Sequence, residues 1–419
     1  MVIPNAKKIE LGNGLSIVTE QIPAMRSVSI GFLIGTGSGN ETPQENGISH
    51  LIEHMLFKGT AKRSAYDIAY ELDAVGGKIN AFTAKEQTMF YSVVLDQHID
   101  LAIDILCDIL LNSKFDAKDM ELEKQVILEE IKMYEDTPDE LIHDYFAEKI
   151  LRGHPIGKST IGTKDIIEAI SHHDIDEYMG KWYTPENTTI AIAGAIPDDT
   201  TERIMAYLHD WQGKTTALMP NYPSIKGGLH LKRKKTEQVH LCLGVQGPSQ
   251  LDPDRYPYSV LDTILGGSMS SRLFQEVREK RGLAYSIYST ASPFRHFGLS
   301  YIYAGVNKKN LEKVVELIMA EICNIKKDGV TPEELNRGKE FLKGTLVLGM
   351  ESTTSRMSWL ARSEFYYGRA MTIEEVFDKV DKVTNDDIIR LANNHFQNKM
   401  LTLAVIGDLR KLPFKELRC

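Results

Sequence analysis

Two histidines and a glutamate stand close together in residues 47–59, which read Gly-Ile-Ser-His-Leu-Ile-Glu-His-Met-Leu-Phe-Lys-Gly. The apolar residues of this segment recur at helical spacing, and Gly59 is a natural stop after a helix. His50 and His54 are four residues apart, so their side chains lie one above the other on one helix face. Two imidazoles placed in this way can bind one Zn²⁺ as neighbouring ligands. Glu53 lies on nearly the same face, where it can act as a general base on a water molecule.

An amphipathic helix that carries these three polar residues by chance is the alternative interpretation. Such a helix would have to bury two imidazoles and a carboxylate beside its apolar face, which is costly unless a partner satisfies them. The tight pattern therefore favours a metal site over chance.

A catalytic zinc needs a third protein ligand and an open position for water. None of the other ten histidines has a second histidine four residues away. The cysteines also form no C-x-x-C pair, since no two of them lie within four residues of one another. They are Cys107, Cys242, Cys323 and Cys419. A carboxylate is therefore the better candidate for the third ligand.

Residues 116–134 predict one long helix with Asp116 as its N-cap. The glutamates that this region carries are Glu121, Glu123, Glu129, Glu130 and Glu135. Glu123 and Glu130 lie two turns apart on one face, flanking Val126 and Ile127, and we expect this face to look inward. A solvated surface position is the alternative for each glutamate, and the helical period alone does not decide among them.

The elements around these helices occur twice along the chain. Each half is expected to open with a strand, continue through helices and close with a strand. The expected elements are strands 27–35 and 189–194 with helix 101–112, and then strands 239–244 and 401–407 with helices 255–265 and 311–325. Runs of β-branched residues between segments of helical period indicate α+β domains. We therefore expect an α+β fold of two similar domains related by internal duplication, each a mostly antiparallel sheet packed against helices.

The two domains are expected at residues 1–215 and 233–419, joined by a linker at 216–232 whose Pro, Gly and polar content suits a connection. The helix of the second half that matches the histidine-bearing one, near 259–267, is apolar and has no ligand set. The basic run at 232–235 is interpreted as a solvated face, because no aromatic residues interleave with it as in a nucleic-acid site.

Composition excludes several classes of protein. The chain has 419 residues, of which 42% are hydrophobic and 26% charged, as in ordinary globular proteins. No run of 18 apolar residues occurs, so we expect no membrane partner. The 49 basic and 58 acidic residues give a net charge of −9, which argues against a nucleic-acid partner. The N-terminal residues have neither a signal-peptide core nor an Arg-rich transit stretch, which favours a cytoplasmic location.

The order H-x-x-E-H reverses the H-E-x-x-H of thermolysin-like enzymes, and residues 47–60 resemble the active-site segment of the pitrilysin-type inverted zincin peptidases. In detail the segment is most similar to the mitochondrial processing peptidase β subunit and its bacterial relatives. Residues 76–83 match the family's G-G-x-x-N-A-x-T segment, and residues 123–131 match its E-x-x-V-x-x-E-I segment. The resemblance covers essentially the whole chain.

This resemblance implies a zinc metalloendopeptidase with one Zn²⁺ per chain. The implied metal ligands are His50, His54 and Glu130, since the family's third ligand follows the second histidine by about 76 residues. Glu53 is then the general base, and Glu123 is the supporting carboxylate that orients a ligand.

The resemblance also implies where a peptide substrate binds. The strand that carries Asn80, Ala81, Phe82 and Thr83 is expected to be a sheet edge that binds an extended peptide by β-addition. An R-x6-Y pair, Arg278 and Tyr285, is expected to bind the substrate backbone, with Tyr285 stabilising the oxyanion.

The family further implies action on extended or unfolded peptides, including a processing role, in a clamshell built from two chains. The partner would be a second copy, as a homodimer, or a related inactive subunit, as a heterodimer. A bacterial cytoplasmic protein is expected rather than one of the mitochondrial matrix, because no transit stretch is present. The competing interpretation is a non-catalytic structural or partner subunit of the same fold, and the intact H-x-x-E-H argues against it.

Overall fold

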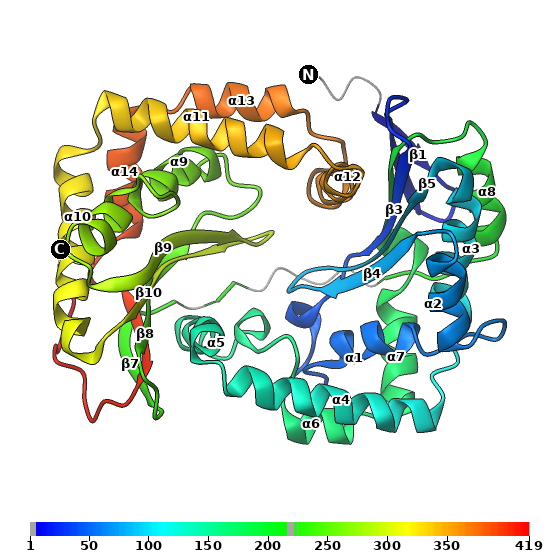
Figure 1. Cartoon of the computed structure of the whole chain (residues 1–419), viewed down its shortest axis with the longest axis horizontal. Coiled ribbons are helices and arrows are strands. Elements are labelled where there is room, and N and C mark those ends of the chain that lie inside the picture. Colours follow the sequence, from blue (N-terminus) through cyan, green and yellow to red (C-terminus); the bar gives the residue numbers. More distant parts are fainter. Residues whose placement is uncertain (1–5, 216–221, 224, 419) are drawn as a thin grey trace. The chain divides into compact units, whose positions relative to one another are not determined.

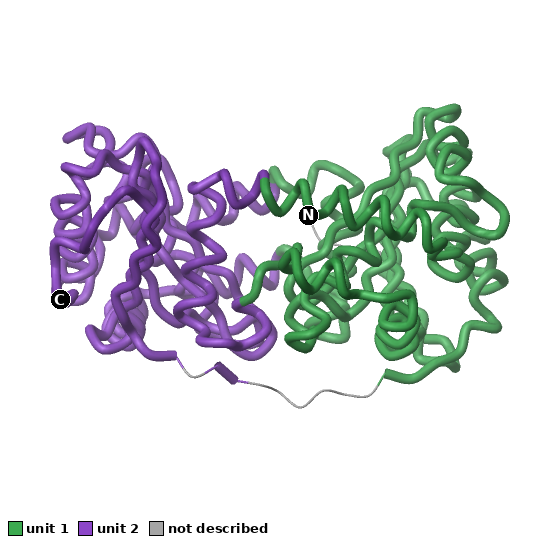
Figure 2. Tube along the Cα trace, turned by 90° about the horizontal axis from the view of Figure 1, so that it is seen from below, with its two compact units in different colours: residues 1–132, 158–219, 348–373 green, residues 133–157, 220–347, 374–419 purple. Residues whose placement is uncertain are grey.

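The computed structural model describes residues 6–215, 222–223 and 225–418. The chain divides into two compact units, shown in different colours in Figure 2. Unit 1 comprises residues 1–132, 158–219 and 348–373, and unit 2 comprises residues 133–157, 220–347 and 374–419. Within the predicted linker 216–232, residues 216–221 and 224 lie outside the described residues.

Unit 1 is built on a six-stranded sheet with the strand order β1-β2-β6-β3-β5-β4. The strands are β1 (Ala6–Glu10), β2 (Ser16–Gln21), β3 (Ser27–Ile34), β4 (Lys78–Thr83), β5 (Thr88–Leu95) and β6 (Thr188–Gly194). Strands β2 and β6 pair in parallel, and the other described neighbours are antiparallel. Strand β4 is therefore an edge strand, as predicted for residues 78–83.

Helices cover both faces of this sheet (Figure 1). They are α1 (Ile48–Leu56), α2 (Ala65–Asp73), α3 (Ile99–Asn112), α4 (Ala117–Glu135), α6 (Lys164–Ala169), α7 (His172–Trp182), α8 (Thr200–Leu208) and α12 (Thr353–Tyr367). The larger core joins one face of the sheet to α1, α3, α7 and α8. A smaller core joins the other face to α12.

Unit 2 is built on a five-stranded sheet with the strand order β7-β11-β8-β10-β9. The strands are β7 (Gly228–Arg233), β8 (Val239–Gly247), β9 (Ala284–Pro293), β10 (Gly298–Val306) and β11 (Thr402–Gly407). The helices are α5 (Pro138–Leu151), α9 (Arg255–Leu265), α10 (Leu311–Asp328), α11 (Pro332–Gly349), α13 (Ile373–Asp381) and α14 (Asn385–His395). Strands β7 and β11 pair in parallel, and the remaining described pairs are antiparallel.

The predicted fold class is confirmed: the chain is α+β, with two similar domains that each pack a mostly antiparallel sheet against helices. The predicted elements match within a few residues. The predicted strand 239–244, for example, extends through β8 to Gly247, and the long glutamate-bearing helix is α4. The Asp116 carboxylate accepts a hydrogen bond from the Lys118 N–H at 2.9 Å, in line with its predicted role as a cap.

Two helices pack in the compact unit that is formed mainly by the other half of the sequence. Helix α5 comes from the first half of the chain but packs against β8 and β11 of unit 2. Helix α12 comes from the second half but packs against β2, β3 and β6 of unit 1. Helix α12 and β3 pack closely at Gly31, where a Cβ atom would lie 2.4 Å from the Met357 sulfur, so a larger residue would require the Met357 side chain to move. The predicted domain boundary at 216–232 therefore stays a prediction about where the duplicated sequence divides. The compact units differ from the predicted domains by the two segments that contain these helices.

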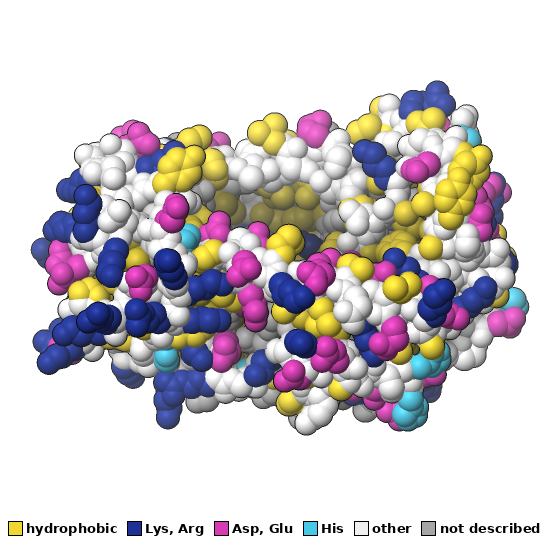
Figure 3. All heavy atoms as spheres, turned by 60° about the horizontal axis from the view of Figure 1, so that its bottom comes forward, with side chains coloured by type: hydrophobic (Ala, Val, Ile, Leu, Met, Phe, Trp, Pro, Cys, Tyr) yellow, Lys and Arg dark blue, Asp and Glu magenta, His cyan; other side chains and the backbone are white. Residues whose placement is uncertain are grey.

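The two units differ in charge. Unit 1 has 20 Lys and Arg against 31 Asp and Glu, whereas unit 2 has 29 against 27. On the face drawn in Figure 3, Lys and Arg side chains gather at the left, over unit 2. The excess of acidic over basic residues in the chain therefore lies in unit 1. Among the described residues, no helix has the length and apolar character needed to cross a membrane.

Candidate metal centre

Helix α1 is held at its N-terminus by a buried carboxylate. The Glu41 side chain accepts hydrogen bonds from the Gly47 N–H at 2.8 Å and the Ser49 N–H at 3.0 Å, groups that have no partner inside the helix. Gly47 has φ of 99°, a left-handed conformation that favours glycine. Burial raises the pKa of Glu41. Polar contacts thus fix the residue at which α1 starts. Five buried apolar side chains fix the position of the helix against the core.

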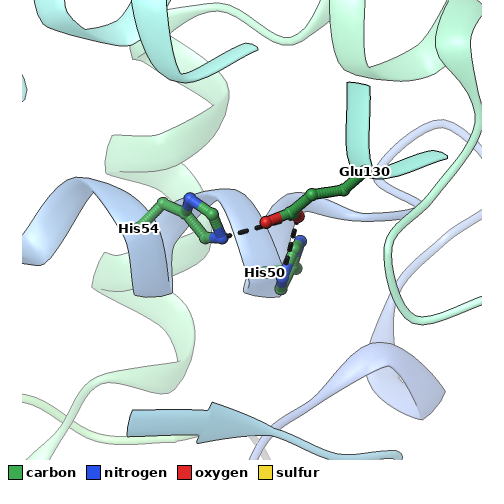
Figure 4. A group of neighbouring side chains, drawn as sticks. All are labelled: His50, His54 and Glu130. Atoms are coloured by element: carbon green, nitrogen blue, oxygen red, sulfur yellow. Dashed lines mark ion pairs between the residues drawn. The ribbon is translucent and has the colours of Figure 1, made fainter. Parts of the chain in front are cut away.

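The side chains of His50, His54 and Glu130 converge at the exposed side of α1 (Figure 4). Glu130 reaches this point from α4, and its Oε2 lies 3.9 Å from His50 Nε2 and 3.8 Å from His54 Nε2. The two imidazole rings meet edge to face with centroids 4.6 Å apart. One ligand atom from each of the three residues lies within 4.8 Å of the others. The structure therefore brings together the three residues predicted to bind the metal.

This donor set fits Zn²⁺. Tetrahedral zinc ligands at about 2.0–2.1 Å from the ion stand about 3.3–3.4 Å from one another, so the two separations between Glu130 and the histidines need adjustments of about 0.5 Å. Burial, and then His54, lowers the pKa of His50 to about 4, which leaves a neutral imidazole with a free lone pair at neutral pH. His50 Nδ1 is buried without a hydrogen-bond partner among the described residues. His50 can therefore offer Nε2 to a metal. Two histidines and a glutamate are a known set of protein ligands for catalytic zinc.

The second histidine is supported by Glu123, as predicted. His54 Nδ1 lies 3.0 Å from Glu123 Oε2, so a proton on Nδ1 directs the Nε2 lone pair toward Glu130. The other oxygen of Glu123 is 2.6 Å from Nζ of Lys58, which lies two residues beyond the end of α1. Lys58 thus neutralises a carboxylate that is only 6% exposed. The sequence analysis missed Lys58, because its contact depends on how the chain turns after the helix.

Glu53 is held beside the metal ligands without joining them. Its Oε2 accepts a hydrogen bond of 2.5 Å from the Thr83 hydroxyl, at the end of β4. Burial raises the pKa of Glu53, which makes the carboxylate a stronger base near neutral pH. The structure thus gives the Thr83 hydroxyl a contact with Glu53, while the role of Thr83 in binding substrate stays a prediction. The other oxygen of Glu53 can still accept a proton from a water molecule.

The remaining predicted residues of β4 lie along the free edge of the sheet. Ala81 packs against the core on the α1 face, and Phe82 packs against the core on the α12 face, as strand alternation requires. Asn80 is exposed, and its Oδ1 accepts a hydrogen bond of 2.8 Å from the Ala81 N–H.

Arg278 and Tyr285 come together in unit 2. The Arg278 guanidinium lies 5.2 Å from the Tyr285 ring centroid and 4.7 Å from that of Phe274. Tyr285 is on the edge strand β9 and is 77% exposed, so it is not a core aromatic. Both side chains are available to a ligand of unit 2.

One inward-looking position on α4 was assigned wrongly. Val126 was expected on the buried face beside Glu123 and Glu130, but its side chain is 45% exposed. Ile127, which was also expected on this face, is buried as predicted, and so is Lys124, which donates a hydrogen bond to the Glu168 carbonyl at 3.3 Å. The inward face therefore differs from the predicted one at Val126, because contacts with neighbouring helices decide the rotation of α4.

The matching helix of unit 2, α9, has a half-buried carboxyl, that of Asp262, instead of a ligand set. Burial raises the pKa of Asp262 to about 6 from the ordinary 3.8. Because the folded pKa is the higher one, the unfolded chain ionises first as the pH rises. The contribution of Asp262 to stability therefore falls between pH 4 and pH 6 and then stays low.

We expect Asp262→Asn to raise the stability of the chain by about 1–3 kcal/mol above pH 6.5 and to have little effect at pH 4. Thermal unfolding of the variant and the wild type at several pH values measures this difference. A Tm difference that does not change with pH would contradict the assignment.

Family profiles match most of the chain. Residues 16–164 match the profile described as "Insulinase (Peptidase family M16)", and residues 169–342 match the one described as "Peptidase M16 inactive domain". The first match contains the converging side chains, and the second contains α9, which has no ligand set.

Relatives and solved structures agree with these matches. The chain is 40% identical to the uncharacterized zinc protease YmxG of Bacillus subtilis, over 97% of this chain and 99% of the relative. It is 39% identical to an uncharacterized zinc protease of Streptomyces coelicolor, over 97% of this chain and 91% of the relative. A structure titled as a peptidase M16 inactive domain from Pseudomonas fluorescens superposes with a TM-score of 0.90 at 21% identity, covering 97% of this chain and 98% of that one. A protease from Helicobacter pylori gives 0.88 at 21% identity, covering 96% and 99%.

Proposed function

The chain belongs to the M16 (insulinase) family of peptidases, and on this premise we propose that it is a zinc metalloendopeptidase that hydrolyses extended or unfolded peptides. The observation that carries the proposal is the convergence of His50, His54 and Glu130 with Glu53 beside them. We also propose a processing role in a bacterial cytoplasm. The resemblance of residues 47–60 to the active-site segment of the mitochondrial processing peptidase β subunit supports the processing role, and relatives from bacteria such as Bacillus subtilis support a bacterial source.

The residues divide the work of hydrolysis among them. His50, His54 and Glu130 would hold Zn²⁺, which supplies polarisation of the scissile carbonyl and acidification of water. Glu53 removes a proton from the attacking water and returns it to the leaving amine. The Thr83 hydroxyl fixes the rotamer of Glu53, and Glu123 fixes the orientation of His54.

Strand β4 supports a role in holding the peptide. It is the edge of the sheet, and its last residue contacts Glu53. A peptide that adds to β4 through main-chain hydrogen bonds needs to be extended but needs little sequence identity. Folded proteins would therefore be poor substrates.

Cleavage of a fluorescence-quenched unstructured peptide, measured before and after chelation, tests the proposal. We expect zinc near one ion per chain, cleavage that chelation stops, and recovery when zinc is returned. A chain that binds zinc but cleaves no member of a peptide library would favour the non-catalytic scaffold or partner subunit.

We propose that two copies of this chain form a homodimer and that Arg278 and Tyr285 of one copy act on peptide bound at the zinc of the other. Their exposure and mutual contact support a role in binding a ligand. Mixing a Glu53→Gln chain with a Tyr285→Phe chain should restore activity that each variant lacks alone. If the mixture is as inactive as its components, action in trans is contradicted.

A further inference from the structure

Helix α12 presents a row of side chains along the edge strand β4, on the face of the sheet opposite α1. We call this row, whose members are four residues apart on one side of the helix, the α12 row. Its members are Thr354, Ser358, Arg362 and Tyr366. At one end, Thr354 lines a pocket together with Lys78, Asn80 and Tyr91. The row therefore begins where β4 begins.

The rest of the row follows β4 to its end. The Arg362 guanidinium lies 5.8 Å from the centroid of the Phe82 ring. The Tyr366 hydroxyl donates a hydrogen bond of 3.0 Å to the carboxylate of Glu86, three residues beyond the strand. Although α12 itself packs on β2, β3 and β6, Thr354, Arg362 and Tyr366 thus reach toward the start of β4, the end of β4 and the loop after it, and Arg362 gives the row its cation.

Arg362 carries a charge that the described part of unit 1 does not neutralise. Its side chain is exposed, and among the described residues it makes no ion pair. Arg356, the other arginine of α12, differs in this respect, because it pairs with the buried Glu20 carboxylate at 2.5 Å. The Phe82 ring holds the Arg362 guanidinium in place, as aromatic faces commonly do, and leaves its donors free.

A peptide added to β4 would direct alternate side chains to the two faces of the sheet. Side chains on one face would meet Thr83 and Glu53, where cleavage takes place under the proposed function. Their immediate neighbours would point to the other face and meet Phe82 and Arg362. The position opposite Phe82 therefore lies within about two residues of the scissile bond.

We propose that Arg362 is a specificity-determining residue that selects peptides with an Asp or Glu side chain at this position. The inference rests on the proposed peptidase function and names its substrate class: extended peptides with a carboxylate next to the cleaved bond. A planar guanidinium matches a carboxylate through two parallel hydrogen bonds, which a lysine side chain cannot offer.

A set of unstructured peptides with one fixed cleaved bond tests this proposal. Each peptide carries Glu, Gln or Lys at one of the three positions on either side of that bond. For the wild type we expect one position at which the ratio of kcat/KM for Glu over Lys is about 10-fold, the size that one exposed ion pair and one like-charge pair produce together. In Arg362→Gln the ratio should fall close to 1, and in Arg362→Glu it should invert.

Arg26→Gln is the matched control, because it removes one exposed arginine of unit 1 away from β4 and should keep the wild-type ratio. If active Arg362→Glu keeps the wild-type ratio at every position, the role of Arg362 is wrong while the peptidase assignment stands. If the wild type cleaves no peptide of any charge, the proposed function itself fails. These two failures are therefore distinguishable.

Discussion

Replacing Glu53 with glutamine is expected to lower kcat by about 10²–10⁴-fold and to leave zinc bound, because a general base contributes about this much to the rate. The amide keeps the size of the side chain and can still contact the Thr83 hydroxyl, which lies 2.5 Å from Glu53 Oε2. It cannot take a proton from water. Glu53 is not among the converging ligand atoms, so the metal content should stay near one ion per chain.

Peptide cleavage and metal analysis on the same purified sample measure the two halves of this prediction. Glu202→Gln, an exposed glutamate on α8 of the same unit, is the control for loss of one negative charge. A Glu53→Gln chain that cleaves at near the wild-type rate would show that another group is the base. A chain that loses its zinc would show that Glu53 is a ligand.

Replacing Glu130 with alanine is expected to abolish both zinc retention and cleavage. Glu130 is the one converging group that comes from α4, and the two histidines on α1 alone leave the ion with two protein ligands. Loss of one ligand from a three-ligand site should weaken zinc binding by more than the 10–100-fold that loss of a supporting residue causes. Zinc affinity of the metal-free chain, measured by competition with a chromophoric chelator, checks this without using activity.

The neighbouring residue provides a matched control. Glu129 is one position away on α4, but its side chain is 72% exposed and pairs with Lys132. Glu129→Ala should retain wild-type zinc affinity and cleavage. Equal zinc affinity in the two variants would show that Glu130 is not a ligand. The third ligand would then have to be sought among the other glutamates of α4.

Periodicity in the sequence was enough to predict one helix for His50 and His54 and another for the candidate glutamates. His50 and His54 are on one helix, so their spacing alone defines their relation. Glu130 is far from them in sequence, and helical periodicity left several glutamates as candidates for the third ligand. The family resemblance indicated Glu130. The packing of α4 brings its carboxylate to the histidines. The rotation of α4 was predicted only roughly, as exposed Val126 demonstrates.

Contacts between distant segments could not be predicted from the sequence. The hydrogen bond from Thr83 to Glu53 depends on how β4 passes α1, and the ion pair between Lys58 and Glu123 depends on how α4 packs. The sheets against which α5 and α12 pack could not be predicted either. An amphipathic pattern indicates that a helix has a buried face but not which sheet covers that face.

Anomalous X-ray diffraction from crystals of the zinc-loaded chain, collected on both sides of the zinc absorption edge, is the most direct test of the metal assignment. We expect one peak per chain, about 2.0–2.1 Å from the Nε2 atoms of His50 and His54 and about 2.0–2.2 Å from a carboxylate oxygen of Glu130. A zinc peak at other residues, or no peak in crystals of a chain that cleaves peptides, would contradict the account.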